Sequence, residues 1–165
     1  MRRILLIPAL IYPYLVALTL IGAFTNRLPG GNIFVLLIIL GVLWLVGLPM
    51  TITYSILAIR SYDAKRAAKG VMILKLSQIP AYIVIFVFGI ICTLTIFTIG
   101  ISVVLIAFDT ISLILSGIAM IPAAAGGYNT LGAGAVILGI LGFVFCADVI
   151  AVVILYKKIP AESAK

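Results

Sequence analysis

Residues 101–156, ISVVLIAFDTISLILSGIAMIPAAAGGYNTLGAGAVILGILGFVFCADVIAVVILY, contain the feature that decides the fold. Two long apolar runs in this stretch each carry one carboxylate, Asp109 in the first and Asp148 in the second. On membrane-insertion scales a charge at the bilayer centre costs about 2.5 to 3.5 kcal/mol, so an acid in such a run normally has a partner, a bound proton or a function. The two acids therefore mark the place where a buried polar site is expected.

The composition of the whole chain is that of a membrane protein. Of 165 residues, 65% are hydrophobic and only 9% are charged, and the mean hydropathy is +1.43. Soluble domains have roughly half apolar and about a quarter charged residues. At about 20 apolar residues per crossing, a chain of this length has no room for a separate soluble domain. We therefore predict one all-α, polytopic transmembrane domain.

Five apolar segments have the length of transmembrane helices. They cover residues 4–24, 33–59, 71–98, 101–125 and 131–156, and a polar tail follows at 157–165.

An alternative has four spans and a re-entrant segment at 101–125, broken near Asp109. Length and apolarity favour the full span. The distribution of charge favours the re-entrant version, because it gathers every cation except Arg27 on one face, as the positive-inside rule expects. Five full spans would instead leave the lysines of the tail opposite the cations at 60–75.

The residue types exclude several chemistries. The chain has no histidine, and its two cysteines, Cys92 and Cys146, lie inside apolar runs. A His- or Cys-based zinc site and a Ser/His/Asp or Cys/His nucleophilic system therefore cannot be assembled. The Gly-x-Gly-Asp motif of intramembrane aspartyl hydrolases is missing before both Asp109 and Asp148. We predict a protein that is not an enzyme, with no metal and no cofactor, and the basic clusters beside apolar spans indicate membrane loops and not nucleic-acid binding.

The fourth apolar segment has a polar stripe. Asp109, Ser112 and Ser116 share one face at helical spacing, and the other faces carry Val, Leu and Ile, so the stripe is predicted to face the bundle. With five full spans, Asp109 and Asp148 would both lie about 13 Å from the outer face at 1.5 Å per residue. Two carboxyl groups at one depth could share a proton or together bind a cation.

A second polar face begins the third segment. Lys75, Gln78 and Tyr82 follow i, i+3, i+7 spacing and therefore share one side of a helix. In one interpretation they form a polar vestibule on the cytoplasmic side. In the other, Lys75 extends to the lipid headgroups while Gln78 and Tyr82 bond to neighbouring helices.

Small residues predict close helix packing at two places. Gly47, Thr51 and Ser55 recur every four residues in the second segment, and Gly139 and Gly142 lie in a glycine-rich face of the fifth. Such faces let another helix approach closely. The glycine-rich fifth helix is a candidate contact for a protein partner or a second copy of the chain.

Prolines inside the apolar segments predict bends. Pro8 and Pro13 lie in the first segment and Pro49 in the second. Each removes a backbone donor, so a carbonyl four residues earlier needs another partner, which neighbouring helices supply in membrane proteins.

Two short stretches carry a resemblance. Residues 75–82, KLSQIPAY, and 145–156, FCADVIAVVILY, resemble stretches of uncharacterised small multi-pass membrane proteins of Gram-positive bacteria. The resemblance implies a bacterial cytoplasmic membrane and brings no activity with it.

Two hypotheses for the function follow. The first is a non-catalytic membrane subunit or assembly or accessory protein, whose acids bond within the bundle. The second is a small transporter or ion-pathway protein that uses Asp109 and Asp148, with Ser112 and Ser116, to bind a proton or cation. In both, the lipid bilayer is the surrounding partner.

Overall fold

The computed structural model describes residues 2–25, 30–61, 64–95 and 99–160, and every regular element in these ranges is helical, which confirms the predicted class. Arg27 and residues 161–165 of the polar tail lie outside the described residues. The elements are η1 (Arg2–Leu6), α1 (Ile7–Phe24), α2 (Gly30–Arg60), α3 (Ala64–Leu94), α4 (Ile99–Ile118), α5 (Ile121–Leu131), α6 (Ala133–Leu141) and α7 (Ala147–Lys158).

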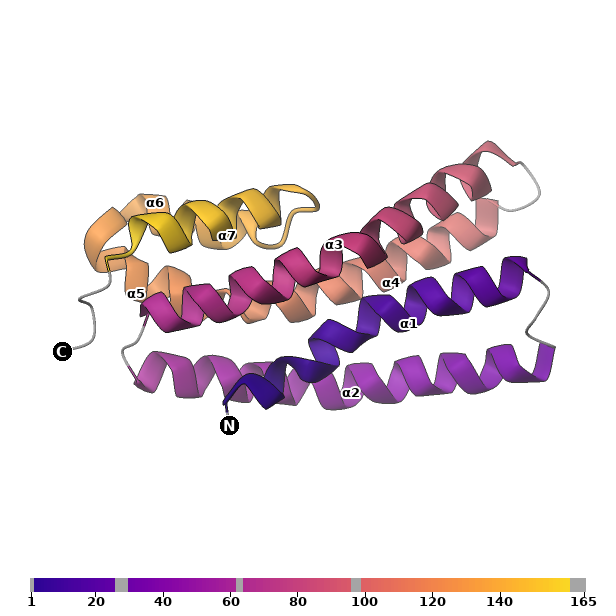
Figure 1. The fold of residues 1–165 in the computed structure, drawn as a ribbon, viewed down its shortest axis with the longest axis horizontal. Helices are drawn as coiled ribbons and strands as arrows, with labels where there is room; N and C mark the ends of the chain where they lie inside the picture. Colours follow the sequence, from indigo (N-terminus) through magenta and orange to yellow (C-terminus); the bar gives the residue numbers. More distant parts are fainter. Residues whose placement is uncertain (1, 26–29, 62–63, 96–98, 161–165) are drawn as a thin grey trace.

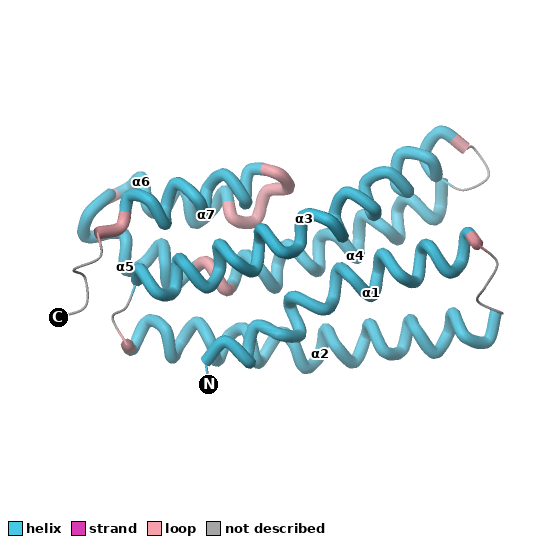
Figure 2. Tube along the Cα trace, in the orientation of Figure 1, coloured by secondary structure: helices cyan, strands magenta, loops and turns pink. Residues whose placement is uncertain are grey.

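Helices α1 to α4 lie side by side along the long axis of the molecule, and α6 and α7 form a short hairpin beside the first half of α3 (Figure 1). The start of η1, the end of α2, the start of α3 and the end of α7 all lie toward one end of the bundle. The turn of the hairpin lies near the middle of α3, where Figure 2 shows the non-helical residues between α6 and α7. The hairpin therefore enters the bundle from one end and returns to it.

Three helical segments, Ile4–Phe24, Val35–Arg60 and Ala64–Leu94, are long and apolar enough to cross a membrane. A fourth span results if α4 and α5, bent by 50° at a short break, count as one. The predicted count of about five is therefore reduced to three or four in the described chain.

The predicted single helix at 131–156 is two helices in the structure. With 9 and 12 residues, α6 and α7 reach only about 14 and 18 Å at 1.5 Å per residue, short of a hydrocarbon core of about 30 Å. The break follows Gly142, and Cys146, which precedes α7, has a φ of 65° that does not continue a helix. Apolarity alone does not separate one span from two short helices packed inside a bundle.

The segment at 101–125 also differs from both sequence interpretations. Helix α4 is continuous through Asp109, and the bend comes later, between Ile118 and Ile121. Pro122 has no N–H to donate to the Ile118 carbonyl, and the Ser55 hydroxyl donates to that carbonyl at 2.8 Å instead. A side chain of α2 thus satisfies the group that the proline leaves free.

The small-residue faces are filled by this chain itself. A Cβ added at Gly47 would lie 3.3 Å from the Cβ of Pro8, and Thr51 and Ser55 are buried beside it. A Cβ at Gly139 would lie 2.9 Å from the Cβ of Ala124, and one at Gly142 would lie 2.6 Å from the sulfur of Met120. The glycine face of α6 therefore packs on α5 and the bend before it.

Candidate functional site

The centre of the molecule holds an ion pair between α3 and the hairpin. The Nζ of Lys75 lies 2.5 Å from Oδ2 of Asp148, and the two side chains are 0% and 3% exposed. Lys75 therefore does not extend to the headgroups, and its charge is balanced inside the bundle. Both residues were candidate site residues in the sequence, but their pairing was not predicted.

The remaining hydrogen-bonding groups of the pair are also satisfied. Lys75 donates to the Ser116 hydroxyl at 2.6 Å and to the Gly142 carbonyl at 3.2 Å, so all three ammonium protons have acceptors. The Val149 N–H donates to Oδ1 of Asp148 at 2.8 Å. Asp148 lies in the first turn of α7 and Gly142 follows the last turn of α6, so the helix dipoles favour an acid at the first position and a cation at the second.

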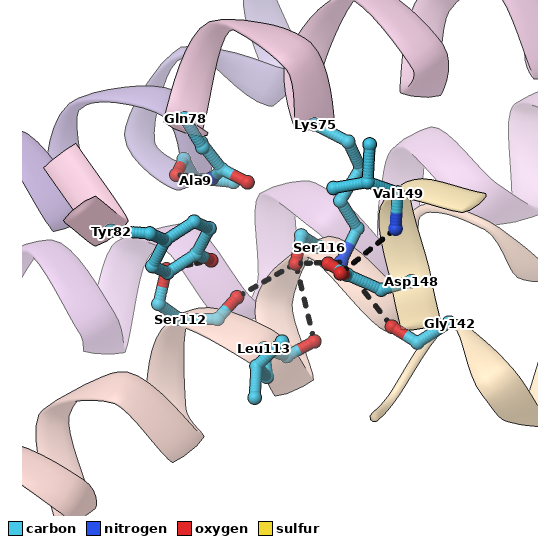
Figure 3. A network of polar contacts seen from close by, with 10 residues as sticks. All are labelled: Ala9, Lys75, Gln78, Tyr82, Ser112, Leu113, Ser116, Gly142, Asp148 and Val149. Carbon is cyan, nitrogen blue, oxygen red and sulfur yellow. Dashed lines mark hydrogen bonds and ion pairs between the residues drawn. The ribbon is translucent and has the colours of Figure 1, made fainter. Parts of the chain in front are cut away.

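The polar stripe of α4 completes the network, which Figure 3 shows from close by. Ser116 donates to the Ser112 carbonyl at 2.9 Å, and the Ser112 hydroxyl lies 2.9 Å from the hydroxyl of Tyr82. Two sets of residues predicted separately, the stripe of α4 and the polar face of α3, therefore contact each other. The structure brings together Lys75, Tyr82, Ser112, Ser116 and Asp148.

Gln78, the remaining residue of the polar face of α3, bonds to a different helix. Its Nε2 donates to the Ala9 carbonyl at 2.7 Å. That carbonyl has no helical donor because the residue four positions later is Pro13. Gln78 is thus a partner of the kind predicted for a carbonyl freed by a proline, although its Oε1 is buried without a hydrogen bond.

Asp109 lies apart from this network. It is seven residues before Ser116 on α4, about 10 Å along the helix axis at 1.5 Å per residue. Its Oδ1 is buried and has no hydrogen-bond partner, and the side chain lines a cavity of about 340 Å³ between α3 and α4. Asp148 is therefore paired with Lys75, and not with Asp109 as the hypothesis of a shared carboxyl site requires.

Three aromatic rings lie where the network meets this cavity. The rings of Tyr82 and Phe145 meet edge to face with centroids 5.8 Å apart, and those of Phe86 and Phe145 stack at 6.2 Å. The same three residues also line a second cavity of about 300 Å³ that reaches Asp148. The three rings therefore line both the cavity at Asp109 and the cavity at Asp148. Apolar composition gave no signal for this role, because Phe145 lies in a turn that the sequence did not predict.

A second lysine of α3 holds the other end of the hairpin. Lys65 donates to the carbonyls of Tyr156 and Ile159, the latter at 2.7 Å, and its Nζ lies 4.3 Å from the centre of the Tyr156 ring. A cation at the C-terminus of α7 also interacts favourably with the helix dipole. Lys65 and Lys75 together contact both ends of α7, so the hairpin is fixed to α3 along its length.

Comparison of the chain with protein-family models, with curated proteins and with solved structures finds no match.

Proposed function

We propose that this is a non-catalytic integral membrane protein that acts as a subunit or accessory protein of a membrane assembly. The observation that carries the proposal is the closure of the central network: each charged group of the Lys75 and Asp148 pair bonds to groups of the same chain. Such a pair serves to hold the hairpin on α3, since all three ammonium protons of Lys75 are donated within the chain and each carboxylate oxygen of Asp148 accepts a hydrogen bond there.

The long apolar helices of the chain indicate a membrane location. We propose the bacterial cytoplasmic membrane, with the cytoplasmic face at the end of the bundle where α2 ends and α7 ends. The cations Arg60, Lys65, Lys157 and Lys158 belong to elements that meet at this end, which agrees with the positive-inside rule.

Helix α2 offers the surface for a membrane partner. Only 17% of the apolar, membrane-spanning stretch of α2 is buried within the chain, against 44% of the corresponding stretch of α1 and 39% of that of α3. Lipid covers such a face in the absence of a partner, so the proposal is tested in the native membrane. A photo-crosslinking residue at Ile38, which is 65% exposed, is expected to capture one protein in stoichiometric amounts, whereas the same residue at Leu40, 1% exposed, captures none. Crosslinks to lipid alone at Ile38 would contradict the subunit role.

A second candidate function is a small transporter or ion-pathway protein. The observation that favours it is the buried, unpartnered Oδ1 of Asp109 beside a cavity. Asp109→Asn is then expected to abolish proton-coupled or cation flux into proteoliposomes, while Thr110→Ala, one residue away on an exposed position, leaves it unchanged. Equal flux in Asp109→Asn and the unmodified chain would exclude this function.

A further inference from the structure

The cavity at Asp109 lies beyond the inner end of the short hairpin. Helices α6 and α7 cover only the first half of α3, and the turn between them ends near its middle (Figure 1). Beyond the turn, α3 and α4 continue side by side, and the cavity of about 340 Å³ lies between them with Phe145 of the turn at one edge. The cavity thus lies along the part of α3 that the hairpin does not cover.

The lining of the cavity defines the chemistry that it can bind. Aliphatic and aromatic side chains form most of it, and among the described residues that line it Asp109 is the one charged group. The rings of Tyr82, Phe86 and Phe145 also line it. A volume of about 300 to 1,000 Å³ with an apolar wall and few polar groups is typical of small-molecule sites.

We infer that this cavity binds an amphipathic ammonium compound, with its N–H group on the carboxylate of Asp109 and its apolar body along α3 and α4. The Asp109 carboxylate lines the cavity, and its Oδ1 is buried without a donor, so an ammonium group on the carboxylate would supply a hydrogen bond and the opposite charge. Aromatic faces within reach add favourable cation–π contact. The inference extends the second candidate function, because it names the ligand class of the same acid, but binding does not require transport.

Binding is measured with tritiated dodecylamine on the full chain in nanodiscs of uncharged lipid, after subtraction of the uptake by empty nanodiscs. Saturable binding is expected, and Asp109→Asn should weaken it by about tenfold to a hundredfold, the range for loss of a charged hydrogen bond. Thr110→Ala should bind as the unmodified chain does. Dodecanol, which has the same chain length but no charge, should compete at least about tenfold more weakly than unlabelled dodecylamine, since it lacks the ion pair.

A second pair of variants tests the cavity without changing its charge. Gly89 lines the cavity and Gly41 lies on α2, and a Cβ added at either would meet no atom within 4 Å. Gly89→Leu should fill the cavity and abolish saturable binding, while Gly41→Leu should preserve it. The inference is overturned if both leucine variants bind alike, if Asp109→Asn binds as tightly as the unmodified chain, or if dodecanol competes as well as the amine. Binding without flux in proteoliposomes would keep the inference and remove the transport function.

Discussion

Lys75 and Asp148 lie 73 residues apart in the chain, and their charged groups meet at 2.5 Å inside the bundle. The contact joins the middle of α3 to the inner end of the α6–α7 hairpin, while Lys65 holds its outer end. A buried pair of this kind adds little net stability compared with apolar residues of the same shape, but loss of one partner leaves an uncompensated charge. We therefore expect the pair to specify where the hairpin lies more than it adds to the stability of the fold.

The ion pair predicts strong coupling between its two residues. Lys75→Met and Asp148→Asn should each lower the free energy of unfolding by about 3 to 5 kcal/mol, because each leaves its partner buried without an opposite charge. The double variant should lose clearly less than the sum. Reversible unfolding in mixed micelles, followed by circular dichroism, measures all three, and Lys157→Met at an exposed position serves as the control. Additive losses would show that the two groups do not interact.

The bond from Gln78 to the Ala9 carbonyl predicts a dependence on Pro13. Gln78→Leu should cost about 1 to 3 kcal/mol, because the carbonyl is then buried without a donor. Pro13→Ala supplies a backbone N–H to the same carbonyl, so Gln78→Leu should cost less in that background. The same unfolding assay on the four proteins of the cycle gives the coupling. An equal cost of Gln78→Leu in both backgrounds would contradict the exchange of partners.

The close approach of α5 to the start of α3 predicts intolerance to one methyl group. A Cβ at position 126 would lie 2.3 Å from the Cβ of Ala64, so Gly126→Ala should lower stability by about 1 to 3 kcal/mol. Gly41→Ala, in open space on α2, should instead raise stability by up to about 1 kcal/mol through helix propensity. Ala64→Gly should restore much of the loss in Gly126→Ala. A neutral Gly126→Ala would mean that the two helices do not pack as described.

The hairpin predicts that the start of α3 and the end of α7 face the same compartment. Single cysteines placed at Ser61 and Lys158 should react with a membrane-impermeant maleimide from one side, and a cysteine at Thr25 should react from the other. Replacement of Cys92 and Cys146 removes the background labelling. Five full spans would place Lys158 on the side of Thr25, so labelling of those two positions together would exclude the hairpin in the membrane.

The faces of the helices follow from the sequence to a large extent. The i, i+3, i+7 spacing of Lys75, Gln78 and Tyr82 put them on one side of α3, and all three are buried. The stripe of α4 likewise faces the bundle at Ser112 and Ser116. Periodicity gives such faces because side-chain direction along a helix is fixed by local geometry.

The partners of these faces did not follow from the sequence. The expected contact between two acids needed Asp109 and Asp148 at one depth, and the depth of Asp148 depended on an unbroken helix at 131–156. The turn at 142–146 reverses the chain direction and brings Asp148 to Lys75. One signal was available, since a lysine beside an apolar span can balance an acid as well as reach the headgroups.

The sequence by itself determined that the chain is helical, that it is apolar enough for a membrane, and which residues lie on the inner faces of α3 and α4, because composition and helical period act within each segment. Only the tertiary structure decided that α6 and α7 form a hairpin, that Lys75 neutralises Asp148, and that Asp109 is left beside a cavity. The reason is that the partner of a buried charge depends on which segments pack together and where a turn reverses the chain. Hydrophobic patterning along one segment carries no information about either.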